Sequence, residues 1–246
     1  MSFILQNIFL FFSAFLAGCS IFLFDFRNEN RMKLMLSFSG AFLFGICVLH
    51  LLPELYQKSN YNAGIYILFG FFLQILLEFF SEGIEHGHVH IHKHHNNHGF
   101  NKFPYLMMVS LSLHSFLEGM PLSFLDNSSN TEISFVIGII LHNIPISIAL
   151  MQMLLMSGIT KKLAVAFLFI FSFMAPLGSF VGYILQANNV FLSSEFYPKI
   201  MGIVIGIFLH ISTTILFETN EQHRFNRYKF FAIIAGGFLA VFSSFI

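Results

Sequence analysis

The sequence predicts an all-α integral membrane protein with one domain over residues 1–246, built as a bundle of eight transmembrane helices. Of its residues, 56% are hydrophobic and only 10% are charged, whereas a soluble domain carries about 25% charged residues. The apolar residues also gather in blocks of about 20, the length that spans the hydrocarbon core of a bilayer. Blocks this long without alternation indicate helices and not strands.

Eight apolar blocks follow one another along the chain, with a short polar break between each block and the next. The first block starts at Phe3 without a basic segment or a clear cleavage site, so we expect it to be a retained span and not a signal peptide. Cys19 and Cys47 lie inside apolar blocks, and we expect both to be small core residues. The blocks cover residues 3–24, 34–56, 63–81, 103–125, 132–156, 162–186, 198–218 and 228–246.

The distribution of lysine and arginine predicts the orientation. Ten of the twelve lie in the first, third, fifth and seventh breaks, and only Lys58 and Lys199 lie on the opposite side. Because cytosolic loops carry the excess of positive charge, both termini are predicted to be non-cytosolic and the break at about 82–102 cytosolic. Asn127 begins a glycosylation sequon on the predicted outer side, with its occupancy left open. The formal net charge of zero gives nucleic-acid binding no electrostatic basis.

The predicted cytosolic loop at 82–102 is rich in histidine. Such density, interleaved with glycine and asparagine, cannot build a core, but it offers many neutral imidazoles to Zn²⁺, Ni²⁺ or Cu²⁺. We therefore expect a flexible chelator with several sites, and the alternatives are a solvated low-complexity loop or a pH-sensing patch. The histidines are His86, His88, His90, His92, His94, His95 and His98.

Two polar clusters inside apolar blocks are the strongest functional signal. His114 and Glu118 are four residues apart, so they share one face of the predicted helix at 103–125, with Ser115 beside them. In the helix at 132–156, His142 and Asn143 precede a proline at 145, which frees a backbone carbonyl and loosens the turn.

Ionisable groups at membrane depth are by default functional candidates. Two imidazoles and a carboxylate, with hydroxyl and amide oxygens nearby, suit a divalent first-row metal. The alternative for a single membrane histidine is a hydrogen bond between helices. No cysteine lies near the clusters, and this donor set favours an ion in transit over a stored ion, because a transported ion must also leave.

Five further polar residues lie in or at the ends of predicted spans. They are expected either to line the metal pathway or to be interfacial end groups with packing roles. They are His50, Glu54, Glu78, His210 and Glu218.

Motifs over nearly the whole chain resemble those of the ZIP (ZRT/IRT-like) divalent metal transporters. The motif in the fourth span is most similar to the plasma-membrane branch of that family. The resemblance implies eight spans, a cytosolic His-rich loop and import of Zn²⁺, Fe²⁺ and related ions, with His114, Glu118 and His142 as central ligands and Ser115 and Asn143 at neighbouring positions. The motifs are Leu49-His50-Leu51-Leu52-Pro53-Glu54, Gly70-Phe71-Phe72-Leu73 ahead of Glu78, His114-Ser115-Phe116-Leu117-Glu118-Gly119, Ala175-Pro176-Leu177-Gly178, and Gly206-Ile207-Phe208-Leu209 ahead of Glu218.

Two adjacent positions depart from the family pattern. Many members carry His-x-x-Pro-Glu-Gly in the fifth span, and this chain has Ile146 and Ser147 where the Glu-Gly pair falls. The resemblance gives that glutamate the role of bridging a second metal. We therefore expect a single ion at the central site.

The expected function is uptake of a divalent transition metal, most simply zinc and alternatively iron, into the cytosol. A metal exporter with a cytosolic His-rich sensor loop is an alternative, and an intramembrane metal-dependent hydrolase is a weaker one, since no His-Glu-x-x-His pattern occurs. We expect no enzyme activity and no permanent cofactor, with Zn²⁺, Fe²⁺, Mn²⁺ or Cd²⁺ as cargo. The expected partners are these ions and the bilayer, with a homodimer left open. The expected location is the plasma membrane, and a vacuolar or vesicular membrane fits the same topology.

Overall fold

The structure is a computed structural model that describes residues 2–24, 29–58, 62–81, 105–125, 130–187, 193–217, 227–243 and 245. Every element in these ranges is helical, and each of the eight apolar blocks contains at least one helix. The elements are α1 (Phe3–Cys19), η1 (Ser20–Phe22), α2 (Glu29–Ile46), η2 (Cys47–Leu51), α3 (Leu52–Lys58), α4 (Ala63–Ser81), α5 (Tyr105–Gly119), η4 (Met120–Phe124), α6 (Asn130–Met156), α7 (Lys161–Ala187), α8 (Ser193–Phe217) and α9 (Arg227–Ser243).

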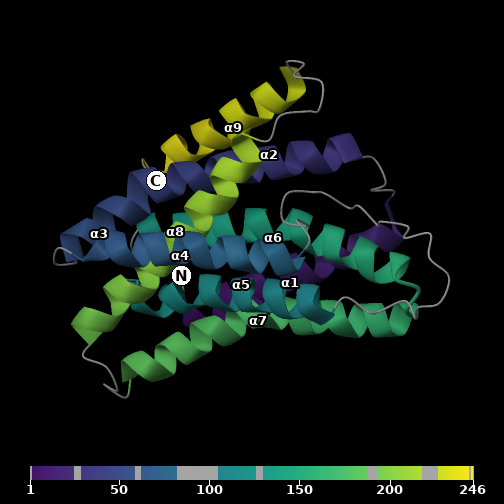
Figure 1. The fold of residues 1–246 in the computed structure, drawn as a ribbon, viewed down its shortest axis with the longest axis horizontal. Helices are drawn as coiled ribbons and strands as arrows, with labels where there is room; N and C mark the ends of the chain where they lie inside the picture. Colours follow the sequence, from purple (N-terminus) through teal and green to yellow (C-terminus); the bar gives the residue numbers. More distant parts are fainter. Residues whose placement is uncertain are drawn as a thin grey trace.

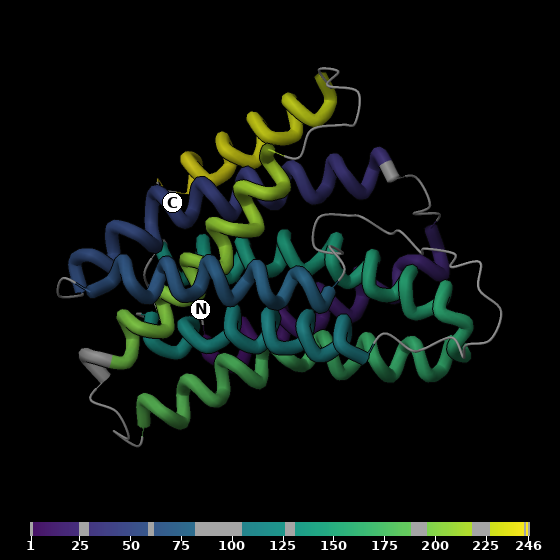
Figure 2. Tube along the Cα trace, viewed as in Figure 1, coloured from purple at the N-terminus to yellow at the C-terminus, as the bar shows by residue number. Residues whose placement is uncertain are grey.

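The helices pack as two groups. Helices α1, α5, α6 and α7 contact one another on one side, and α2, α4, α8 and α9 do so on the other. Figure 1 shows α2 beside α9 along the upper edge and α7 along the lower edge, and Figure 2 traces the same paths. The groups meet where α4 packs on α5 and where α2 packs on α6. The two clusters predicted to hold metal therefore lie on helices at this junction.

Six helical segments in the described ranges are long and apolar enough to cross a membrane, judged by length and composition. This agrees with the predicted α-helical membrane protein, but by this measure the count is six and not eight. Helices α5 and α9 fall short because they have only 15 and 17 residues. The predicted span at 103–125 is divided, since α5 ends at Gly119 and continues as the 3₁₀ turn η4.

Prolines lie in two of the helical segments described next, and one of them follows a departure from regular α-helix. Before Pro53, the turn η2 is π-helical, and the Leu52 N–H donates to the Cys47 carbonyl five residues back. Proline cannot donate a backbone hydrogen bond, so the turn preceding it is the easiest to widen. Pro145 lies inside α6, where the Ser147 hydroxyl donates to the Asn143 carbonyl at 2.7 Å.

Close helix contacts hold α5 against α7 and α4 against α8. A methyl group at Gly178 would overlap the Phe116 carbonyl oxygen, and one at Gly119 would overlap the Ala175 carbonyl oxygen. Gly206 on α8 meets the Ile67 carbonyl of α4 in the same way. Small residues at such contacts let helix backbones approach closely where lipid gives no hydrophobic drive to associate.

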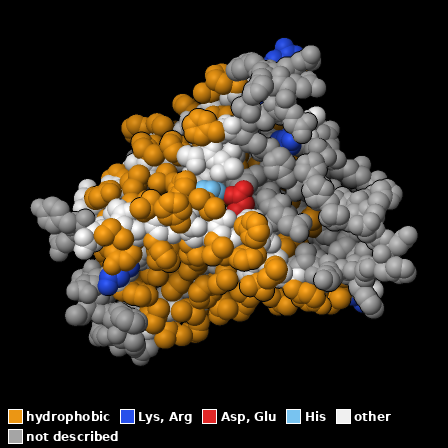
Figure 3. Space-filling model, viewed as in Figure 1, with side chains coloured by type: hydrophobic (Ala, Val, Ile, Leu, Met, Phe, Trp, Pro, Cys, Tyr) orange, Lys and Arg blue, Asp and Glu red, His pale blue; other side chains and the backbone are white. Residues whose placement is uncertain are grey.

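The outer surface is largely apolar. Leu68, Phe72 and Phe79 on α4 are 57%, 59% and 78% exposed. Figure 3 shows that hydrophobic side chains cover most of the visible face, with an acidic and a histidine side chain next to each other among them. Exposed apolar area of this extent is unfavourable in water and is what a lipid-facing surface requires.

Candidate metal site

The first half of the site comes from α5. Its residues His114, Ser115 and Glu118 are 0%, 2% and 0% exposed, because the face that carries them packs inside the bundle while Leu106, Val109 and Leu113 face outward. The spacing of four residues brings the His114 Nε2 atom to 2.8 Å from Glu118 Oε1.

The second half comes from α6, one turn ahead of Pro145. His142 and Asn143 are 0% and 3% exposed. The His142 Nε2 atom lies 3.9 Å from the same Glu118 Oε1, and the rings of His142 and His114 have their centroids 5.8 Å apart. The Asn143 Nδ2 atom donates to Glu118 Oε2 at 3.4 Å, so both carboxylate oxygens of Glu118 have neighbours from the site.

One atom each from His114, Glu118 and His142 forms a set whose members all lie within 4.8 Å of one another. Zinc bonds of 2.0–2.2 Å in tetrahedral geometry place ligand atoms about 3.3 Å apart. The observed separations of 2.8 and 3.9 Å bracket that value. Small side-chain movements would therefore let the three groups share one divalent ion, with an open fourth position.

The chemistry of burial supports the same use. A carboxylate and two imidazoles taken wholly out of water are costly unless they are paired or bind a metal. The Asn143 Oδ1 atom is also buried and has no hydrogen-bond partner among the described residues. Ser115 is buried beside His114, and its ligand role stays a prediction.

The sequence interpretation missed Gln74, a fully buried residue of α4. Its Oε1 atom lies 3.2 Å from His114 Nδ1, on the opposite side of the ring from Glu118. The available signal was a polar residue inside an apolar block, one helical turn before Glu78.

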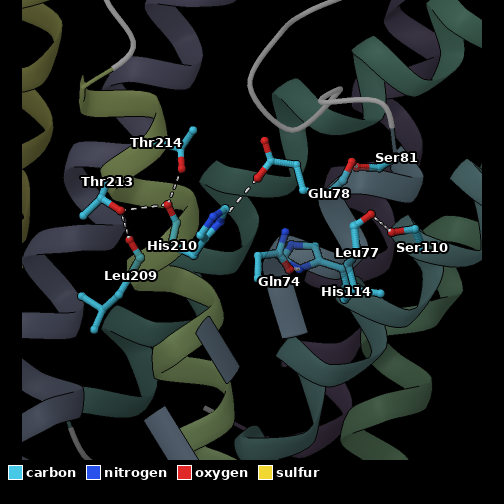
Figure 4. Close-up of polar contacts among 10 residues, drawn as sticks. All are labelled: Gln74, Leu77, Glu78, Ser81, Ser110, His114, Leu209, His210, Thr213 and Thr214. Atoms are coloured by element: carbon cyan, nitrogen blue, oxygen red, sulfur yellow. Dashed lines mark hydrogen bonds and ion pairs between the residues drawn. The ribbon is translucent and has the colours of Figure 1, made fainter. Parts of the chain in front are cut away.

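Glu78 and His210 form a separate pair, in which Glu78 Oε2 is 3.5 Å from His210 Nδ1. Their side chains are 25% and 10% exposed, unlike those of the central set. Figure 4 shows Gln74 and Glu78 on α4 directed toward different neighbours, His114 and His210. The Thr213 and Thr214 hydroxyls both donate to the His210 carbonyl.

Glu54 accepts hydrogen bonds from two other side chains. Its Oε1 atom accepts hydrogen bonds from Lys58 Nζ at 2.8 Å and from the Tyr197 hydroxyl at 2.9 Å, and these contacts join α3 to α8. His50 lies in the π-helical turn η2. Neither residue belongs to the group of three, His114, Glu118 and His142, that could hold a metal ion.

Other predicted positions lie outside the described residues. They are Glu218, the sequon at Asn127, and the loop histidines His86, His88, His90, His92, His94, His95 and His98. Ile146 is described and fully buried, and it packs in an apolar cluster with residues of α5 and α7 such as Leu111 and Phe171.

Comparison with known proteins adds independent information. One relative is "Protein zntD" of Dictyostelium discoideum, which is 28% identical over 126 residues. That match covers 50% of this chain but only 18% of the relative's length. Residues 85–244 match the family described as ZIP Zinc transporter, which is more than half of the chain and includes α5 to α9. The chain therefore belongs to the ZIP zinc transporter family.

Proposed function

We propose that the protein carries a divalent transition metal, zinc first and iron as an alternative, across a membrane through the site at His114, Glu118 and His142. The observation that carries the proposal is the convergence of these three buried groups, from two helices, within 4.8 Å. Membership of the ZIP family supports transport over hydrolysis. Asn143 and Ser115 are proposed as neighbouring donors.

The proposed topology has eight spans with both termini outside the cytosol. Helix α5 and the turn η4 together have 20 residues, and rises of 1.5 and 2.0 Å per residue give a length of about 32 Å. The 17 residues of α9 give about 26 Å, a mismatch that a bilayer of about 30 Å accommodates by local thinning. The charge bias places the His-rich loop on the cytosolic side, the resemblance to ZIP transporters favours uptake toward the cytosol, and the plasma membrane is the proposed location.

A single ion is proposed for the central site. Ile146 is fully buried in an apolar cluster and supplies no ligand. The pair of Glu78 and His210, less buried than the central group, is proposed as part of the pathway on the side where α4 ends, because it offers an imidazole and a carboxylate 3.5 Å apart. The His-rich loop follows α4 in sequence and is proposed to bind metal released there.

The test is zinc flux into proteoliposomes that contain the full chain and a trapped zinc-sensitive dye. His114→Ala should abolish the flux, since it removes one of the three proposed ligands. His223→Ala should not, because His223 lies in the polar break between the last two apolar blocks and outside the proposed site. Competition by excess Fe²⁺, Mn²⁺ and Cd²⁺ would rank the cargo. Wild-type flux in the His114→Ala protein would refute the site.

Direction is tested in the same vesicles after sorting by orientation. Flux only from the cytosolic side would show that the protein exports the metal and does not take it up. Bound metal with hydrolysis of a test amide and no flux would replace transport by catalysis.

A further inference from the structure

The side chain of Gln74 connects the central site to the other group of helices through its contact with His114. It lies on α4, is fully buried, and has its Oε1 atom 3.2 Å from Nδ1 of His114. The ligand it contacts lies on α5. The contact therefore crosses the junction between the two helix groups.

The geometry determines which nitrogen of His114 can bind metal. The Nε2 atom faces the Glu118 carboxylate at 2.8 Å and belongs to the set of ligand atoms. An ion bound there takes the lone pair of Nε2, so the proton of the neutral ring must lie on Nδ1. A donor at Nδ1 needs an acceptor, and the Oε1 atom of Gln74 lies at the required place.

We propose that Gln74 is a positioning residue for metal binding. Its amide oxygen accepts the Nδ1 proton of His114, holds the ring in the tautomer that presents Nε2 to the ion, and fixes the orientation of the ring. This inference rests on the proposed function of the His114 site. Hydrogen bonds of this kind to a metal-bound histidine are worth about 10–100-fold in metal affinity.

A purely structural role makes a different prediction. If the contact only held α4 against α5, any substitution that kept the volume and folding of the protein would leave metal affinity unchanged. Substitutions at position 74 can therefore distinguish a role of Gln74 as hydrogen-bond acceptor from a role in packing α4 against α5. Gln74→Met keeps the length of the side chain and removes the acceptor, and Gln74→Glu restores an acceptor.

The chain supplies a matched control in Gln6 on α1. Gln6 is also fully buried, and neither atom of its amide has a hydrogen-bond partner among the described residues. Gln6→Met therefore makes the same chemical change at the same burial without touching a histidine.

The experiment measures zinc affinity of the purified full chain in detergent by competition with a fluorescent chelator. We expect Gln74→Met to weaken zinc binding by about 10–100-fold, and Gln74→Glu to bind at least as tightly as the wild type. Gln6→Met should bind like the wild type. Thermal unfolding checks that each variant is folded, and Gln74→Asn, which withdraws the oxygen from Nδ1, replaces Gln74→Met if that variant is not.

The outcomes separate the two proposals. Wild-type affinity in folded Gln74→Met or Gln74→Asn would overturn the role of Gln74 while leaving the site intact. Equal loss in Gln74→Met and Gln74→Glu would assign the contact to packing. If His114→Ala binds zinc as tightly as the wild type, the proposed site fails, and the role of Gln74 fails with it.

Discussion

Gly178 provides a strong test of how packing controls the metal site, although it lies on α7 and supplies no ligand. A Cβ atom at Gly178 would meet the backbone carbonyl of Phe116 on α5, which lies between His114 and Glu118 in the sequence. Replacing Gly178 by alanine adds only one methyl group. That methyl group has no room, because its neighbour is a backbone carbonyl and not a flexible side chain.

The size of the effect follows from the contact. The added carbon would sit more than 1 Å inside the 3.0 Å that real Cβ atoms keep from other atoms, so α5 and α7 must separate by about that amount. Overpacking of this kind costs about 1–3 kcal/mol of stability. Metal sites tolerate only about 0.2 Å in ligand distances. Because α5 carries His114 and Glu118 and α6 carries His142, a displacement of α5 away from α7 changes the distances among the three proposed ligands. Zinc binding should therefore weaken by at least about tenfold, on the scale of other orienting contacts.

The assay combines thermal unfolding with zinc flux as a function of zinc concentration. Gly178→Ala should lower the unfolding midpoint by several degrees and raise the zinc concentration needed for half-maximal flux. The control is Gly237→Ala on α9, where an added methyl group meets nothing within 4 Å. If Gly178→Ala matches Gly237→Ala in both measurements, the close contact of α5 with α7 does not set the geometry of the site.

Two further substitutions test the electrostatics. Glu118→Gln keeps the shape of the side chain but removes the carboxylate charge that lies beside both His114 and His142. Zinc affinity should fall by more than tenfold, on the order of the effect of losing an orienting contact, while the metal-free protein should unfold at the same or a higher temperature. Wild-type zinc affinity in this variant would contradict the ligand role of Glu118. Tyr197→Phe removes the hydroxyl that donates to Glu54 and should lower stability by about 1 kcal/mol. In a double-mutant cycle with Glu54→Met, which removes the acceptor, the two losses should not add, and full additivity would show that the hydrogen bond contributes nothing.

The helices, and the shared helix face of His114 and Glu118, could be predicted because their signals are local. Blocks of apolar residues define helices by length alone, and the spacing of His114 and Glu118 places both on one face of any helix. The position of His142 beside Glu118 is harder to predict, because it also requires α5 and α6 to be adjacent. The structure supplies that adjacency, and His142 Nε2 lies 3.9 Å from Glu118 Oε1.

Contacts between distant segments could not be predicted in the same way. Gln74 precedes His114 by 40 residues, and nothing in either local pattern specifies that α4 places its amide behind the ring. Glu54 illustrates the reverse case: it was a candidate for the pathway, and the structure pairs it with Lys58 and with Tyr197, which lies 143 residues away. Such partners depend on how helices pack, which hydrophobic periodicity does not encode.

The position of the site along its two helices also sets its depth in the bilayer. His114 lies nine residues after the start of α5 at Tyr105, about 13 Å along the helix. His142 lies twelve residues after the start of α6 at Asn130, about 18 Å from the opposite face. On the proposed topology, in which α5 and α6 cross the membrane in opposite directions, the two lengths sum to about 30 Å, the thickness of the hydrocarbon core, which places the cluster near the middle of the membrane.

An ion that reaches this depth from outside has crossed about half of the transmembrane voltage. Moving one charge through 100 mV is worth about 2.3 kcal/mol, so a divalent ion moved half-way gains about 2.3 kcal/mol. When the cell interior is 100 mV negative, the apparent affinity of the site for an ion from the outer side therefore rises by about fifty-fold without any change in its ligands. On the proposed topology, the apparent zinc affinity of the protein is therefore a property of the polarised membrane as well as of His114, Glu118 and His142.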